Sequence, residues 1–127
     1  MQQFVWRLAH NSLPLPMGPK RRGIECDTLC VCCKRLDEDG AHLFLRCKEV
    51  KRVWHRLQLE NTRLCMCAGN DAKEVIKILF ELDENRRVPV VCMLWCWWSR
   101  RNKINAKESG ESIDNVLTRI RTAFLTV

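Results

Sequence analysis

The sequence has no hydrophobic run long enough to cross a lipid bilayer. Its longest apolar stretch, residues 88–98, has eleven residues and includes a proline, whereas a membrane-spanning helix needs about 20 residues. The first residues do not form the apolar segment of a secretory signal, because Arg7 and His10 interrupt them. Internal repeats, a glycine-rich phosphate loop and a nucleophile elbow are also missing. We therefore expect an intracellular protein of the nucleus or cytoplasm that does not insert into membranes.

The acidic residues do not form the pattern of a catalytic site. Asp37, Glu38 and Asp39 make one group, and Asp83 and Glu84 make another. Both groups fall in predicted turns or helix ends, whereas two-metal nucleases need several carboxylates that converge on divalent ions. We therefore predict no enzymatic activity.

Basic residues outnumber acidic residues by 22 to 15, which gives a formal net charge of +7. Fourteen of the basic residues are arginines, whose guanidinium groups can bind two phosphate oxygens at once. This balance favours a polyanionic partner, but charge alone does not choose among DNA, RNA and acidic lipid. A surface that is merely soluble has the same composition.

Hydrophobic periodicity predicts an all-α fold with a cysteine-rich loop between the first and second helices. The first helix is expected over residues 3–12, and the proline-rich segment 13–19 ends it, because proline removes a backbone donor. Residues 24–40 show no periodicity and are predicted to be a loop. From residue 41 onward, apolar residues recur at steps of four and three and share one helix face: Leu43, Cys47, Val50, Trp54 and Leu57.

Three further helices are predicted after a break at residues 61–70. Asp71 with Glu74 three residues later forms a variant capping box and marks a helix start. Pro89 suits the first turn of the next helix, because backbone N–H groups in a first turn have no acceptor within the helix and the missing N–H of proline costs nothing there. Ser112 is predicted to cap the last helix.

Nine cysteines are a high and odd number for 127 residues. In a reducing compartment such thiols stay free or bind metal. Cys30, Cys33, His42 and Cys47 follow the spacing C-x2-C-x8-H-x4-C, and thiolate and imidazole are the usual protein ligands of tetrahedral zinc. Four protein ligands leave no position for water, so this spacing predicts a structural Zn²⁺ site. The five-residue step from His42 to Cys47 requires a local distortion at the helix entry.

The other cysteines leave alternatives open. Cys32 is a rival to Cys33, but it would leave only one residue between itself and Cys30, and Cys26 is a further candidate ligand. Two more pairs have no histidine nearby and are expected to be buried thiols: Cys65 with Cys67, and Cys92 with Cys96. The remaining histidines, His10 and His55, are predicted to be surface or packing residues.

These motifs resemble the zinc-binding domain that follows the reverse transcriptase domain in plant LINE-type (non-LTR) retrotransposons. The segment FVWRLAHNSLP is similar to the opening helix of that domain, RRGIECDTLCVCC to its first ligand pair, and DEDGAHLFLRCKEVKRVW to its second pair. LWCWWSRRNKIN is similar, more loosely, to a helix that leads toward an RNase H-like domain. The prolines at 16 and 19 depart from the family pattern.

The resemblance implies a division of the chain and a function. Residues 1–60 would be the reverse-transcriptase-type zinc-binding domain, and residues 61–127 a helical connector toward the missing RNase H-like domain. RNA or DNA handling beside a reverse transcriptase is implied, so the chain would be a non-catalytic remnant of such a polyprotein.

Basic residues on both sides of the metal motif predict a phosphate-binding surface: Lys20, Arg21, Arg22, Lys48, Lys51, Arg52 and Arg56. The alternative is that these charges only keep an amphipathic helix soluble. A different hypothesis is a protein-interaction or purely structural module, since the segment from Trp95 to Trp98 carries apolar residues around much of its helix and would then be the partner surface.

Overall fold

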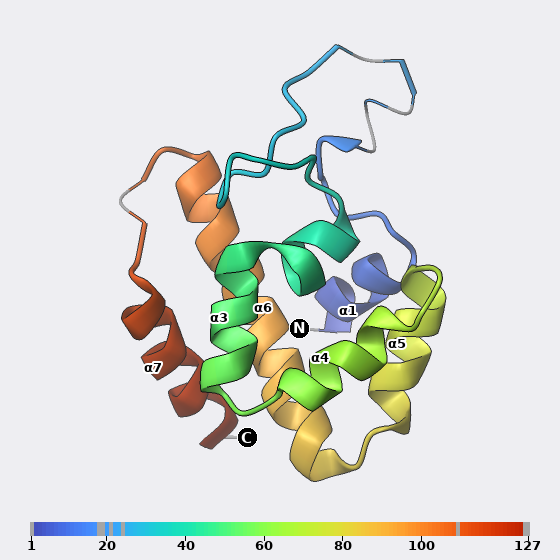
Figure 1. The fold of residues 1–127 in the computed structure, drawn as a ribbon, viewed down its shortest axis with the longest axis vertical. Helices are drawn as coiled ribbons and strands as arrows, with labels where there is room; N and C mark the ends of the chain where they lie inside the picture. Colours follow the sequence, from blue (N-terminus) through green and yellow to red (C-terminus); the bar gives the residue numbers. More distant parts are fainter. Residues whose placement is uncertain (1, 18–19, 21, 24, 109, 126–127) are drawn as a thin grey trace.

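Helices arranged around one long helix make up the fold in this computed structural model, which describes residues 2–17, 20, 22–23, 25–108 and 110–125. The long helix, α6, runs lengthwise through the molecule, with α7 on one side and α1 and α5 on the other (Figure 1). The elements are α1 (Gln2–Ala9), the π-helix η1 (His42–Arg46), α3 (Lys48–Arg56), α4 (Glu60–Cys67), α5 (Ala72–Glu81), α6 (Glu84–Asn105) and α7 (Ile113–Leu125). The predicted all-α fold with a cysteine-rich loop after the first helix is confirmed for the described residues.

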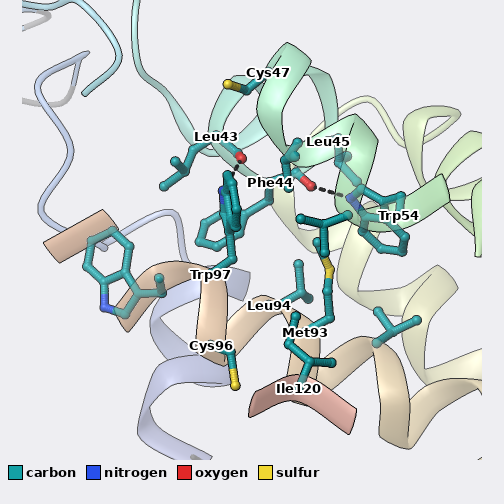
Figure 2. Packing of buried hydrophobic residues seen from close by; sticks show 14 of the residues in the cluster. Leu43, Phe44, Leu45, Cys47, Trp54, Met93, Leu94, Cys96, Trp97 and Ile120 are labelled. Carbon is teal, nitrogen blue, oxygen red and sulfur yellow. Dashed lines mark hydrogen bonds between the residues drawn. The ribbon is translucent and has the colours of Figure 1, made fainter. Parts of the chain in front are cut away.

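One hydrophobic core contains residues from both sides of position 60. Two buried indoles reach the same short element: Trp54 donates through Nε1 to the carbonyl of Phe44 at 2.8 Å, and Trp97 donates to that of Leu43 at 3.0 Å (Figure 2). A buried indole N–H needs such an acceptor, because an unpaired polar group in the core is costly. The π-helix η1 is therefore held by α3 from one side and by α6 from the other. The division of the chain at residue 60 stays a prediction.

Helix α4 occupies the segment that the sequence predicts as a break, so that prediction was wrong. The local sequence is only weakly amphipathic, and packing decides its conformation. Arg63 is buried, and its guanidinium donates to the carboxylate of Glu60 and, at 2.9 Å, to the carbonyl of Leu45 in η1. Met66 of the same helix lies in the core.

Helix α6 starts five residues before Pro89, which is inside the helix and not in its first turn as predicted. Asp83 is the N-cap, and its side chain accepts a hydrogen bond from the backbone N–H of Arg86 at 3.0 Å. Pro89 cannot donate to the carbonyl four residues earlier, but the position lies close enough to the helix start that the remaining ladder is retained. The two other predicted caps are confirmed, since Asp71 accepts from the N–H of Glu74 at 2.9 Å and Ser112 accepts from that of Asn115 at 3.1 Å.

The tryptophan-rich segment is mostly covered. Trp97 and Trp98 are 0% and 8% exposed, and Phe4 of α1 packs against Trp98 and Trp95. Trp95 remains 38% exposed, so a partner surface at residues 95–98 would be limited to that one indole. Trp6 of α1 is 60% exposed. Within the described part of the chain, no helix is both long and apolar enough to span a bilayer.

Candidate metal centre

A short antiparallel pairing presents the first two cysteines. Leu29 and Asp37 form a β-bridge, and the N–H of Cys30 donates to the carbonyl of Leu36 at 2.8 Å. The turn between the paired segments closes when the N–H of Lys34 donates to the carbonyl of Cys30 at 2.9 Å. Lys34 has a φ of 56°, in the left-handed region that favours glycine. This tight turn brings Cys33 back toward Cys30.

The π-helix η1 explains the unusual step between the other two candidate ligands. The N–H of Cys47 donates to the carbonyl of His42 at 2.6 Å, which is the i→i+5 bond of a π-turn. On a regular α-helix, residues five apart point in different directions, because each residue advances the helix by about 100°. The wider turn stacks His42 and Cys47 on one side. The side chain of Asp39 accepts from the N–H of His42 at 2.8 Å and fixes where the turn begins.

Cys30, Cys33, His42 and Cys47 converge at one point. Their three Sγ atoms and one imidazole nitrogen all lie within 4.8 Å of one another. Sγ of Cys30 is 4.0 Å from Sγ of Cys47, and Sγ of Cys33 is 3.3 Å from Nε2 of His42. Zinc–sulfur bonds of about 2.3 Å place tetrahedral ligands about 3.8 Å apart. Cys30 and Cys47 are fully buried and His42 nearly so, so the set fits a closed, four-coordinate ion.

The electrostatics of the cluster also suit a cation. Hydrogen bonds from the Cys32 and Cys47 thiols, and then from the backbone N–H groups of Cys33 and Cys32, hold the pKa of Cys30 far below its ordinary value. The pKa values of Cys32 and Cys47 are raised instead, chiefly through their hydrogen bonds to Cys30 and then by burial. A divalent ion at the cluster would favour the thiolate forms of Cys30 and Cys47, because its charge lowers the pKa of a coordinating thiol.

Backbone dipoles at the start of α3 face the fourth ligand. Cys47 is the N-cap of this helix and makes no side-chain capping hydrogen bond. The backbone N–H groups of Glu49 and Val50 favour its thiolate, although Cys30 and burial raise the pKa of Cys47 overall. Polar groups of this kind around a ligand help to orient it and to tune a bound metal.

The remaining cysteines lie outside this cluster. Cys32 is adjacent to it, with Sγ 3.9 Å from Nη1 of Arg100. Cys92 and Cys96 are buried free thiols, as predicted, but Cys65 is exposed, so the prediction of a buried pair with Cys67 was wrong. The described residues contain no second group of three or more potential ligands that lie together.

A buried ion pair behind the cluster was not predicted. Glu38 is 0% and Arg101 4% exposed, and their closest oxygen and nitrogen atoms are 2.5 Å apart. Arg101 comes from α6, so the pair joins the cysteine-rich loop at residues 25–40, which we call the metal loop, to the central helix across 63 positions of sequence. The guanidinium of Arg101 also lies over the ring of Trp98, at 5.3 Å from its centroid. Nothing in the local sequence pattern distinguishes Glu38 from Asp37 and Asp39 beside it, neither of which is buried.

The predicted phosphate-binding residues lie on the surface. Lys48, Lys51, Arg52 and Arg56 are exposed along α3, and we call this set the α3 basic face. Arg56 also pairs with Asp114 of α7 at 2.6 Å. Lys20 and Arg22 are exposed in the segment before the metal loop. Arg21 lies outside the described residues.

Fold and site together define a helical protein with a buried candidate metal centre of three cysteines and one histidine. Residues 1–54 match the family described as zinc-binding in reverse transcriptase, and this range includes all four converging side chains. The similarity to this family therefore covers the part of the chain that holds the candidate metal centre. No curated protein and no solved structure matched the chain. The family match ends before α6, which supplies Arg101.

Proposed function

We propose that Cys30, Cys33, His42 and Cys47 bind one structural Zn²⁺ ion. The convergence of these four donors within 4.8 Å carries the proposal. When bound, the ion would cross-link the cysteine-rich loop to the start of α3, and apparent binding energies of such sites reach about 10–16 kcal/mol. With four protein ligands the ion offers no position for a reacting water. The module is accordingly proposed to be non-catalytic.

Native mass spectrometry with and without a chelator tests the metal site. The wild-type chain is expected to carry one zinc ion, and Cys47→Ser is expected to lose it. Cys65→Ser is the matched control, because Cys65 is exposed and outside the cluster. The assignment would be refuted if the wild-type protein, purified in the presence of zinc salts, carried no metal. It would also be refuted if Cys47→Ser and Cys65→Ser carried equal amounts of zinc.

We further propose that the module binds nucleic acid through the α3 basic face, together with Lys20, Arg21 and Arg22. Support comes from the exposure of the α3 cations and from the net charge of +7. The matched family is described as zinc-binding in reverse transcriptase, which also favours a nucleic-acid partner. Origin from a plant LINE-type retrotransposon rests on the resemblance of the sequence motifs. Action in the nucleus or cytoplasm rests on the nine free cysteines, which suit a reducing compartment. RNA and DNA are both arms of the test.

Fluorescence anisotropy with single-stranded RNA and DNA tests this binding at ~50 mM salt, where phosphate contacts are strong. The double variant Lys51→Glu/Arg52→Glu is expected to weaken binding. The slope of the logarithm of the binding constant against the logarithm of the salt concentration is expected to become less steep by about 0.7 per lost phosphate contact. Lys73→Glu/Lys77→Glu is the matched control, with the same charge change on exposed positions of α5. Absence of binding by the wild type, or equal losses in both variants, would contradict a specific α3 face.

A further inference from the structure

A pocket of about 320 Å³ lies between α1, η1 and the turn from α4 to α5. The buried residues of its lining are apolar, and among them are Phe44, Met66, Ile76 and Leu94. Exposed residues of the lining are mostly polar, and they include Asn11, Arg46, Asn70 and Asp71. An apolar interior with a few polar groups at the entrance is typical of a site for a small molecule or group.

The turn that carries two candidate metal ligands also forms one wall of this pocket. Residues 39–41 and 44–46 line the pocket, whereas His42 and Cys47 belong to the metal cluster. The shape of the wall therefore depends on the same π-turn that the metal would stabilise. Figure 2 shows that Cys47, directly after η1, lies apart from the core cluster that contains Leu94.

The pocket is continuous in sequence with the α3 basic face. Arg46 lines the pocket and is exposed, and Lys48 begins α3 two positions later. A single strand whose phosphates contacted these cations would hold a base next to the pocket, since every nucleotide carries one phosphate and one base.

We propose that this pocket binds one unpaired nucleobase of a single strand whose phosphates contact Arg46 and the α3 basic face. The inference rests on the proposed nucleic-acid function and specifies its substrate as single-stranded. Apolar walls suit the two faces of a base, and the Asn11 and Asn70 amides can both donate to and accept from its edge. The carboxylate of Asp71 favours bases that carry an amino group, such as adenine and cytosine. A base within a duplex is stacked and paired, so it could enter only after being flipped out.

Binding of two oligonucleotides by the zinc-loaded full chain tests the proposal. One is an oligoadenylate of about 12 nucleotides, within the range that small single-strand-binding domains cover, and the other has the same backbone with abasic residues. The wild type is expected to prefer the intact strand about 5- to 150-fold, the effect of about 1–3 kcal/mol per bound base. Ala72→Leu, which fills the pocket from the first turn of α5, is expected to remove the preference but keep the salt dependence.

Ala68→Leu is the matched control, because Ala68 is exposed and does not line the pocket. A second measurement needs no variant: adenosine 5′-monophosphate is expected to shift the NMR amide signals of Ala41, Asn70 and Ala72. Equal binding of intact and abasic strands, or a preference that survives Ala72→Leu, would overturn the pocket while leaving the α3 basic face standing. Failure of the wild type to bind either strand would instead overturn the proposed function and the pocket together.

Discussion

The buried pair of Glu38 and Arg101 allows a quantitative prediction, because removing either partner leaves an uncompensated charge in the core. Glu38→Leu or Arg101→Met alone is expected to lower the free energy of unfolding by about 3–5 kcal/mol. This is a large share of the ~5–15 kcal/mol that holds a typical domain together. In the double variant both charges are gone, and apolar side chains of similar volume take the place of the ion pair. Its loss is expected to be well below the sum of the two single losses, with a coupling of about 3 kcal/mol or more.

Denaturant unfolding of the zinc-loaded variants measures these free energies. Zinc affinity, from competition with a chromophoric chelator, gives a second readout, because Glu38 lies in the loop between the two ligand pairs. A loss of about 3 kcal/mol in the folded loop corresponds to about a 100-fold weaker apparent affinity. Arg56→Met is the control, since it breaks the exposed pair with Asp114 and is expected to cost about 0–1 kcal/mol. The reasoning would be refuted if each single variant lost as little stability as Arg56→Met, or if the losses simply added in the double variant. Either result would show that the ion pair does not hold α6 to the metal loop.

Three further predictions concern single positions. Lys34→Gly is expected to stabilise the fold by about 0.5–1 kcal/mol, because it relieves the left-handed backbone at φ 56°; thermal unfolding of this variant beside Lys34→Ala checks it, and equal values for the two would argue against strain. Asp71→Ala is expected to cost about 1 kcal/mol through loss of the α5 cap, measured by denaturant unfolding, and a neutral result would show that the cap contributes nothing. Burial raises the pKa of the Cys92 and Cys96 thiols above their ordinary 9.0, so the unfolded chain loses these protons first and stability falls as pH rises above about 9. Replacing both by alanine is expected to reduce that fall, and an unchanged pH profile of unfolding would contradict it.

The four-ligand spacing and the resemblance to a zinc-binding family follow from the sequence alone. Cys30 and Cys33 are separated by two residues in a segment without periodicity, and the apolar face from Leu43 to Trp54 follows directly. Capping residues at 71 and 112 predicted two helix starts because capping chemistry is local. Even the required distortion between His42 and Cys47 followed from counting residues, although its form, a π-turn closed at 2.6 Å, did not.

Other features depend on contacts between distant segments. Helix α4 forms where propensity is weak, because Arg63 and Met66 are held by the core. The inward or outward position of Trp6 cannot be deduced from its own helix, since it depends on which neighbour covers which face.

Local chemistry therefore determined the candidate metal ligands, the helix caps and the helical class, since each of these follows from residue types and spacings within short segments of the chain. Only the tertiary structure decided that α6 completes the metal loop through Arg101, that a pocket opens beside η1, and which tryptophans are covered. The reason is physical: burial and ion pairing depend on the packing of segments up to 63 positions apart, and no short window of sequence contains both partners.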